Sequence, residues 1–323
     1  MRIQFVVVAF RSGAEIVGFL DSIAADAPPG SIVVVVDNAS PDASAAIARS
    51  HASRPRIVAS PVNLGFGGGC NLGAADSKAE ALFFLNPDAR LKPGATAILV
   101  ATLQGDATLA VVAPRVIDPT GESRAASAGA EPSVRSTIGH FLGLGRVPGL
   151  RRFLRPVYLA DGRVRTRPDW VSGAAMLVRK SAYGEVGGFD GRIFMYMEDV
   201  DLCRRLREKG WAIGYEPDAV VEHVMGHSQS VDQPVRWYSA YHAYVAEYGG
   251  RASGEGRLAG GRARPGPAGG GLSGQAAGEL DEDGPQRPRG PASRRLPPGA
   301  PLREGVEVGV AGPAPALRGW PCA

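Results

Sequence analysis

Three acids follow an apolar segment and open a stretch with leucines at helical spacing: Glu198, Asp199 and Asp201. They fall in the first turn of a predicted helix, where carboxylates suit the positive end of the helix dipole. Asp201 can pair with Arg204 or Arg205, three and four residues later. Glu198 and Asp199 have no such local partner, and an acid of this kind is a candidate general base. The plain alternative is that these acids only cap a surface helix, as acidic helix starts often do.

Polar residues also stand at the ends of apolar runs that are typical of strands. Asp37 follows one such run, and residues 86–88, Asn-Pro-Asp, follow another. In open α/β sheets, ligands bind beyond the carboxyl ends of the strands. An acid on a stiff proline turn, such as Asp88, is well placed for a divalent cation that prefers oxygen ligands. His223 or His227 would be a natural further ligand. The alternatives are that a lone histidine is structural, as it more often is, and that Asp37 and Asp88 are ordinary turn residues after a strand.

A glycine-rich stretch, residues 61–73, lets the backbone approach a ligand closely. Gly65 and Gly67 suggest the dinucleotide fingerprint Gly-x-Gly-x-x-Gly, but Cys70 stands where the third glycine belongs. No Gly-Lys-Ser/Thr follows, so the Walker pattern for phosphates is absent as well. We interpret the stretch as a loop that enters a helix beside a nucleoside.

The order of strand-like and helix-like segments predicts an α/β fold. Apolar, β-branched runs indicate strands at residues 5–9, 32–36, 57–59, 82–85, 111–114, 170–178 and 211–215. Apolar residues at helical spacing indicate helices at 14–23, 43–49, 95–103, 198–206 and 237–248. Strands that are apolar on both faces are typical of a parallel sheet buried between helix layers. Residues 119–167 look irregular, and the basic and apolar mixture of 135–167 fits either an anionic membrane surface or a solvated insertion.

Composition narrows the functional class. The chain has 323 residues, is 44% hydrophobic and carries a formal net charge of +4, which is too small to indicate nucleic acid. Its three cysteines show no metal-type spacing, so neither a disulfide framework nor a zinc site is indicated, and a reducing cytoplasm is the simplest setting. Residues 1–10 resemble a first strand rather than a signal peptide, and no run approaches the roughly 20 apolar residues needed to span a bilayer.

The character of the chain changes after residue 249. Residues 251–323 contain no Ile, Phe, Tyr, Met, Lys, Asn or Thr and are dominated by Gly, Pro, Ala and Arg. Such a composition cannot form a packed core, so we predict a low-complexity, disordered tail over residues 250–323. Two hypotheses explain its origin: the tail is a genuine segment of the protein, or it is the product of a shifted reading frame.

Four motifs follow one another along the chain: residues 35–40 (Val-Val-Asp-Asn-Ala-Ser), 63–66 (Asn-Leu-Gly-Phe), 86–88 (Asn-Pro-Asp) and 187–202, a run that ends in the acidic stretch. Together they resemble the family 2 inverting glycosyltransferases with the GT-A fold, especially the bacterial rhamnosyltransferase-like branch. The resemblance spans about residues 4–248. It implies a mostly parallel central sheet flanked by helices in one GT-A domain, 1–249. This domain would have a Rossmann-like nucleotide-sugar half at about 1–115 and an acceptor half at about 168–249.

The resemblance also implies roles for single residues. Asp199 matches the family's general base, and Asp88 and His223 would hold a divalent cation, Mg or Mn, with Asn86 replacing the first acid of the family's Asp-x-Asp motif. Residues expected to contact the nucleotide are Ala9, Asp37, Asn63, Gly65, Asn71 and Asn86. Residues expected to contact the acceptor are Trp170, Gly173 and Glu198. Asp37 would accept from a ring N–H of the base, which favours uracil or thymine.

The implied reaction is a single displacement that moves a sugar, rhamnose or a similar hexose, from a dTDP- or UDP-sugar to a hydroxyl. The acceptor would be a cell-envelope glycan or a polyprenyl-linked molecule, which predicts a cytoplasmic protein with peripheral contact at the inner face of the membrane. One alternative is a catalytically silent nucleotide-sugar or glycan-binding protein, which would need no base. Another is a sugar-nucleotide-forming nucleotidyltransferase, for which residues 10–14 are a poor version of the required basic, glycine-rich loop.

Overall fold

The computed structural model describes residues 1–122, 127–142, 157–158, 163–223 and 233–248. The strands are β1 (Ile3–Ala9), β2 (Ile32–Asn38), β3 (Arg56–Ser60), β4 (Ala81–Leu85), β5 (Ala89–Leu91), β6 (Leu109–Ile117), β7 (Ala128–Gly129), β8 (Trp170–Val171), β9 (Ala175–Arg179) and β10 (Ala212–His223). The helices are α1 (Ile16–Asp26), α2 (Ser44–Ser50), α3 (Gly65–Ala74), α4 (Ala95–Gly105), α5 (Val134–Phe141), α6 (Lys180–Glu185), α7 (Glu198–Glu208) and α8 (Gln233–Tyr248). The predicted tail, 250–323, lies outside the described residues.

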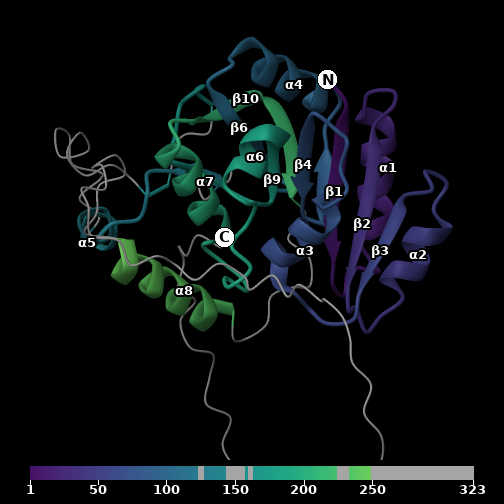
Figure 1. Ribbon diagram of the computed structural model, residues 1–323, viewed down its shortest axis with the longest axis horizontal. Coiled ribbons are helices and arrows are strands. Elements are labelled where there is room, and N and C mark those ends of the chain that lie inside the picture. Colours follow the sequence, from purple (N-terminus) through teal and green to yellow (C-terminus); the bar gives the residue numbers. More distant parts are fainter. Residues whose placement is uncertain (123–126, 143–156, 159–162, 224–232, 249–323) are drawn as a thin grey trace, which may run out of the picture. The chain divides into compact units, whose positions relative to one another are not determined.

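An eight-stranded sheet in the order β3-β2-β1-β4-β9-β6-β10-β5 forms the centre (Figure 1). The pairs β1–β2, β1–β4, β2–β3 and β6–β10 are parallel, whereas β9 and β5 pair with their neighbours in antiparallel fashion. In Figure 1, α1 and α2 lie next to β2 and β3 at one end of the sheet, and α7 and α8 lie toward the other. The predicted α/β fold with a mostly parallel sheet between helices is confirmed.

Alternate residues of β1 face opposite helix layers, as the two-residue period of a strand requires. Phe5 and Val7 pack in a cluster with apolar residues of α1 and α4, whereas Val6 and Val8 pack with α3. The glycines of α3 allow this close packing, because a Cβ at Gly73 would lie 2.5 Å from Val6 Cγ1. The stretch 61–73 that we interpreted as a loop entering a helix is therefore helical from Gly65 onward, and part of its glycine content serves packing between helix and sheet.

Two predicted segments differ in the structure. The region 119–167 is not irregular throughout, because α5 occupies residues 134–141. Its start is fixed by a reciprocal cap, in which the Ser136 N–H donates to Ser133 Oγ and the Ser133 N–H donates to Ser136 Oγ. The predicted strand 170–178 is divided at residues 172–174 into β8, which pairs with β7, and β9, which enters the main sheet.

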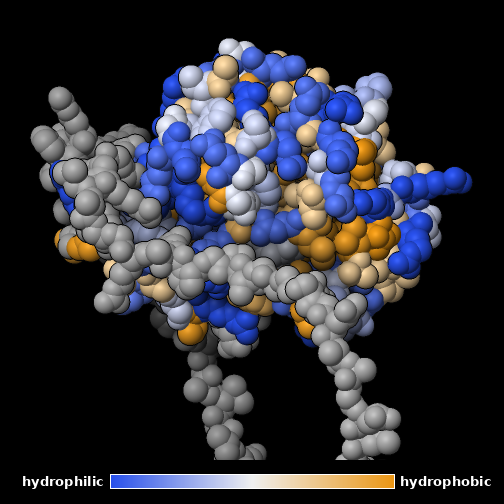
Figure 2. All heavy atoms as spheres, viewed as in Figure 1, coloured by the Kyte–Doolittle hydropathy of each residue, from blue (hydrophilic) through white to orange (hydrophobic). Residues whose placement is uncertain are grey.

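The surface shows both polar and apolar areas. Viewed in the direction of Figure 1, apolar side chains gather over the region of β2, β3 and α3 (Figure 2). Exposed Phe10 and Val62 follow the carboxyl ends of β1 and β3. Among the described helices, none has both the length and the apolar character needed to cross a membrane.

Candidate active site

Asp199 is the second residue of α7, and backbone N–H groups hold its carboxylate. The Gly173 N–H donates to Oδ2 and the Val200 N–H donates to Oδ1, each at 2.8 Å. Burial raises the pKa of Asp199, and these hydrogen bonds to the charged form oppose the rise. The residue as a whole is nonetheless only partly buried. A carboxylate that is oriented by fixed donors and has a raised pKa can accept a proton from a hydroxyl.

Glu198, the neighbouring acid, is almost fully buried, with 7% of its surface exposed. It packs against α3, because a Cβ at Gly67 would lie 3.6 Å from Glu198 Cβ. Its Oε2 is buried and has no hydrogen-bond partner among the described residues. Burial, and then the nearby charge of Asp199, raise the pKa of Glu198 well above its ordinary value. Burial therefore favours the protonated, neutral form of the Glu198 carboxyl. The contact with the acceptor that we expect of Glu198 stays a prediction.

The start of α7 is held in place by side chains from its own second turn. Asp201 pairs with Arg205 at 2.7 Å, which confirms the i,i+4 pair expected from the sequence. Arg205 also donates to the carbonyl of Gly188 at 2.7 Å. The chain enters the helix through Tyr196 and Met197, both with φ of 67°. Two consecutive non-glycine residues in the left-handed region are costly, and such strain is concentrated at functional sites.

The proposed metal ligands come together because β5 pairs with β10. The antiparallel register sets Ala89 opposite His223, so that Asp88, one residue before β5, reaches the imidazole. His223 Nε2 lies 3.0 Å from Asp88 Oδ1 and 3.2 Å from Asn86 Nδ2. A carboxylate and an imidazole at this spacing can bind one cation, so the two residues fit the expected ion. The described residues contain no group of three or more His, Cys, Asp and Glu side chains arranged for a metal, so further ligands would have to come from elsewhere.

The break between β8 and β9 joins these two centres. The Asn86 N–H donates to the Ala174 carbonyl at 3.0 Å, and the Gly173 N–H donates to Asp199 at 2.8 Å. Gly173 also lies against α3, since a Cβ there would lie 2.7 Å from Phe66 Cε1. Residues 173 and 174 therefore connect the Asn-Pro-Asp motif, the glycine-rich helix and the candidate base.

At the carboxyl ends of β1 and β2, Ala9 and Asp37 are neighbours in the parallel register. Asn38, which our prediction of nucleotide contacts omitted, joins β2 to the loop before α3. Its Nδ2 donates to Asn63 Oδ1 at 2.9 Å and to the Gly65 carbonyl at 3.0 Å, and its Oδ1 accepts from the Leu64 N–H at 2.8 Å. The sequence signals for this role were a polar residue at the end of an apolar strand and its place in the motif of residues 35–40.

Side-chain hydrogen bonds also hold the turn after β2. Asp37 Oδ1 accepts from the Ser40 N–H at 3.0 Å, across Ala39 with φ of 57°. Asp42 accepts from Ser40 and Ser44, and from the Gly13 N–H at 3.1 Å in the turn after β1. Although burial alone would raise it, these hydrogen bonds lower the pKa of Asp42 to about 2. Asp42 therefore remains a carboxylate that ties the two strand ends together.

Asn71 lies on α3, and its amide is directed at the segment that precedes α7. Its Nδ2 donates to the Phe189 carbonyl and its Oδ1 accepts from the Phe189 N–H, each at 2.9 Å, and Oδ1 also accepts from the Tyr183 hydroxyl. The nucleotide contact expected of Asn71 stays a prediction. In the structure this side chain links the glycine-rich helix to the segment that precedes α7.

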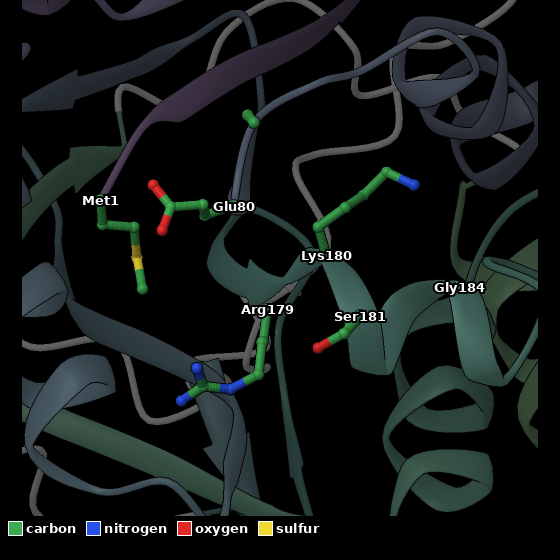
Figure 3. A pocket seen from close by; sticks show the side chains of 7 residues that line it. Met1, Glu80, Arg179, Lys180, Ser181 and Gly184 are labelled. Carbon is green, nitrogen blue, oxygen red and sulfur yellow. The ribbon is translucent and has the colours of Figure 1, made fainter.

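A cavity of about 560 Å³ lies elsewhere among the described residues, near the amino ends of β1 and β4 (Figure 3). Glu80 in its wall accepts from the Arg2 N–H, and Arg179 donates to the carbonyls of Leu103 and Leu109. In Figure 3 the side chains of Arg179 and Lys180 point away from each other. Because ligands of such sheets bind at the carboxyl ends of the strands, and because these polar groups serve the fold, we assign this cavity no chemistry.

Comparison with known proteins by sequence finds glycosyltransferases. The family model described as glycosyl transferase family 2 matches residues 4–155. The N-acetylglucosaminyl-diphospho-decaprenol L-rhamnosyltransferase of Mycobacterium tuberculosis is 31% identical over 259 residues, which cover 73% of this chain and 80% of that protein.

Two solved structures share the fold at low sequence identity. GalNAc-T7 with UDP, GalNAc and Mn²⁺ has a TM-score of 0.55 at 15% identity, and the match covers 76% of this chain but 47% of that one. The mannosyltransferase PcManGT of Pyrobaculum calidifontis, in complex with GDP-Man and Mn²⁺, has a TM-score of 0.54 at 18% identity, covering 76% of this chain and 63% of that one. These likenesses establish the fold and nothing beyond it.

Proposed function

Because the chain belongs to glycosyl transferase family 2, we propose that it moves a sugar from a nucleoside-diphosphate sugar to a hydroxyl of a cell-envelope glycan or lipid-linked acceptor, with inversion at the anomeric carbon. That it is a glycosyltransferase follows from the family and from its 31% identity to a rhamnosyltransferase. The name of that relative supports L-rhamnose as the sugar and a diphospho-polyprenol as the acceptor. Such an acceptor would bring the enzyme to a membrane surface.

One observation carries the proposal: a chain of hydrogen bonds joins the candidate metal ligands to the candidate base. It runs from His223 to the Asn86 side chain, from the Asn86 N–H to Ala174, and from Gly173 to Asp199. A transferase needs its leaving diphosphate and its acceptor hydroxyl on opposite sides of one anomeric carbon. Centres tied together through two adjacent residues satisfy this need for proximity.

In the proposed reaction, Asp199 accepts the proton of the acceptor hydroxyl as that oxygen attacks the anomeric carbon. The bond between this carbon and the diphosphate oxygen breaks, and the electron pair leaves with the nucleoside diphosphate. The N–H groups of Gly173 and Val200 orient the carboxylate, so that its remaining lone pairs are available to the acceptor. A general base of this kind contributes typically about 10²–10⁴-fold to the rate.

Asp88 and His223 are the residues that would hold a divalent cation. When bound, a cation there supplies positive charge that stabilises the leaving diphosphate. The Mn²⁺ in the two solved structures of this fold supports a cation of this type. Because Asn86 is not an acid, we expect weak cation affinity until the diphosphate of the donor adds oxygen ligands.

The donor base would bind at the ends of β1 and β2. Ala9 and Asp37 are adjacent there, and Asp37 could accept from the ring N–H of thymine or uracil, which supports a dTDP- or UDP-sugar. Asn63 and Gly65 would line the same edge, held by Asn38.

Calorimetry with dTDP, UDP and GDP, with and without Mn²⁺, tests the donor assignment. We expect one of the first two to bind, with a large gain in affinity from Mn²⁺. Asp88→Ala should abolish that gain, whereas Asp76→Ala, which removes an exposed acid after α3, should leave it intact. A folded wild-type protein that binds no nucleoside diphosphate, or tight Mn²⁺ binding without nucleotide, would contradict the proposal.

A further inference from the structure

Arg90 is the middle residue of β5, two residues after Asp88, and it is partly buried. Its Nη1 donates to the Ala89 carbonyl at 2.9 Å and to the Pro87 carbonyl at 3.4 Å. These carbonyls belong to the residues directly before and after Asp88. One guanidinium, whose donors have a fixed planar geometry, therefore holds the backbone on both sides of the residue that would bind the cation.

The same guanidinium reaches the loop that follows β1. Its Nη2 donates to the Glu15 carbonyl, directly before α1, at 2.8 Å. The Glu15 N–H donates to the Ser12 carbonyl at 3.1 Å, and the Ser12 N–H donates to Ser44 Oγ of α2 at 2.8 Å. Arg90 therefore connects the turn that carries Asp88 to the loops at the ends of β1 and β2, where the donor base would bind.

Helix α1 leaves room for this side chain at Gly18. A Cβ at this position would lie 2.8 Å from Arg90 Nε and 3.0 Å from its Nη2. A side chain at position 18 would therefore push the guanidinium out of its present place. Glycine is a weak helix former, so α1 is locally less stable at the position that admits the guanidinium.

A second contact attaches the segment between β4 and α4 to the other end of α1. The carboxylate of Asp26, the last residue of α1, accepts from the N–H groups of Gly94 and Thr96, the latter at 2.8 Å. Residues 87–96 are thus bonded to α1 twice, through Arg90 near their start and through Asp26 near their end. The backbone around Asp88 is positioned by a helix that lies more than 60 residues earlier in the chain.

The charge of Arg90 acts on a cation in the opposite direction to its hydrogen bonds. A guanidinium stays protonated in proteins, and its charge interacts with that of Asp88. It would therefore repel a cation bound to that carboxylate. The hydrogen bonds, by contrast, favour the cation because they fix the backbone that presents the carboxylate. Because the two effects have opposite signs, a variant of Arg90 distinguishes them.

We propose that Arg90 is a positioning residue, which fixes the Asp88 turn against the loop after β1 so that cation binding and nucleotide binding strengthen each other. The inference rests on the proposed function and names the side chain that couples the cation to the donor. Groups that orient a metal ligand without touching the metal typically account for about 10–100-fold in metal affinity. Because coupling between two ligands is reciprocal, the same factor is measured on the nucleotide.

The test is calorimetry on Arg90→Met with dTDP or UDP, whichever the wild type binds, with and without Mn²⁺. We define the gain as the Kd without Mn²⁺ divided by the Kd with it. We expect the gain to fall about tenfold, and the Kd without Mn²⁺ to change less than about twofold. Arg90→Lys retains the charge but lacks the planar fork, so its gain should also fall. Arg49→Met, which removes an exposed arginine at the end of α2, is the matched control and should retain the wild-type gain.

Gly18→Ala displaces the guanidinium without removing it. The gain should fall in this variant too, although alanine favours the helix, so a weakened α1 does not explain the fall. Gly184→Ala is its control, because Gly184 also lies in a helix and an added Cβ there would have nothing within 4 Å. If Arg90→Met does not fold, Arg90→Lys and Gly18→Ala decide.

Three results would overturn the inference. An unchanged gain in Arg90→Met would show that Arg90 does not position Asp88, and a larger gain would show that only its charge acts. Equal weakening of the nucleotide with and without Mn²⁺ would show that Arg90 only stabilises the fold. Each of these leaves the proposed function standing, whereas a folded wild type that binds no nucleoside diphosphate would overturn the proposed function and this inference with it.

Discussion

The proposed donor side of the site, at the ends of β1 and β2, and its proposed acceptor side, at the start of α7, differ in how their polar groups are satisfied. At the ends of β1 and β2, Asn38 makes three hydrogen bonds and Asp42 collects donors from two turns. At the start of α7, Glu198 Oε2 is buried without a partner among the described residues, and Met197 has φ of 67°. Left-handed backbone occurs on both sides, since Ala39 after β2 has φ of 57°. What distinguishes the proposed acceptor side is the buried carboxyl oxygen of Glu198, whose desolvation no described partner relieves.

Asp199→Asn tests whether the proposed acceptor side can be disabled without affecting the proposed donor side. The amide can still accept from Gly173, but it cannot take a proton, so we expect kcat to fall by about 10³-fold. The Kd of the nucleoside diphosphate should change less than about twofold, since the donor side does not depend on this carboxylate. Single-turnover transfer and calorimetry on the same sample separate the two effects. Near-normal kcat would remove Asp199 from the role of base.

The elements were predictable where their signal is local. The period of Leu202 and Leu206 and the acids before them indicated α7, and the i,i+4 pair from Asp201 was confirmed because helix geometry alone fixes it. The residues alone left Glu198 and Asp199 as equal candidates for the base, and only the family resemblance singled out Asp199, since its donor Gly173 lies 26 residues away. No local pattern signals such a contact.

The same reason explains what the sequence did not reveal. Asn38 matters because it reaches Asn63 and Gly65, which lie 25 and 27 residues later in the chain. Arg90 reaches Glu15, which lies 75 residues earlier in the chain, and its place depends on the absence of a side chain at Gly18. Contacts of this type are set by tertiary packing, which sequence periodicity does not encode.

Gly65→Ala sharpens the comparison, because this residue lies where the two sides touch. Its φ is +72°, and an added Cβ would lie 1.9 Å from the Phe194 carbonyl oxygen of the segment before α7. The Phe66 N–H donates to the same oxygen at 3.2 Å. We expect a loss of about 3 kcal/mol in the free energy of unfolding, from backbone strain together with displacement of that segment. Denaturant titration measures it.

Gly94→Ala is the matched control for that variant. Gly94 has φ of +84° but nothing within 4 Å of an added Cβ, so it carries the strain of the left-handed backbone without the clash. We expect a loss of about 1–2 kcal/mol and unaltered nucleotide affinity. Equal losses in the two variants would mean that residues 65 and 194 do not couple the donor side to the acceptor side.

Glu198→Gln tests the buried acid with the smallest change in shape. The pKa of Glu198 is raised in the folded protein, so between its ordinary value of 4.5 and the raised one the unfolded chain releases the proton that the folded chain retains. The wild type therefore loses stability as the pH rises through this window, and glutamine, which does not titrate, avoids that loss. We compare the free energies of unfolding of the two proteins as variant minus wild type. Between about pH 5 and about pH 7.5, we expect this difference to increase by about 1 kcal/mol or more, because one pKa unit corresponds to about 1.4 kcal/mol. A difference that does not depend on pH would show that Glu198 is ionised in the fold, and the acceptor side would then be as well satisfied as the donor side.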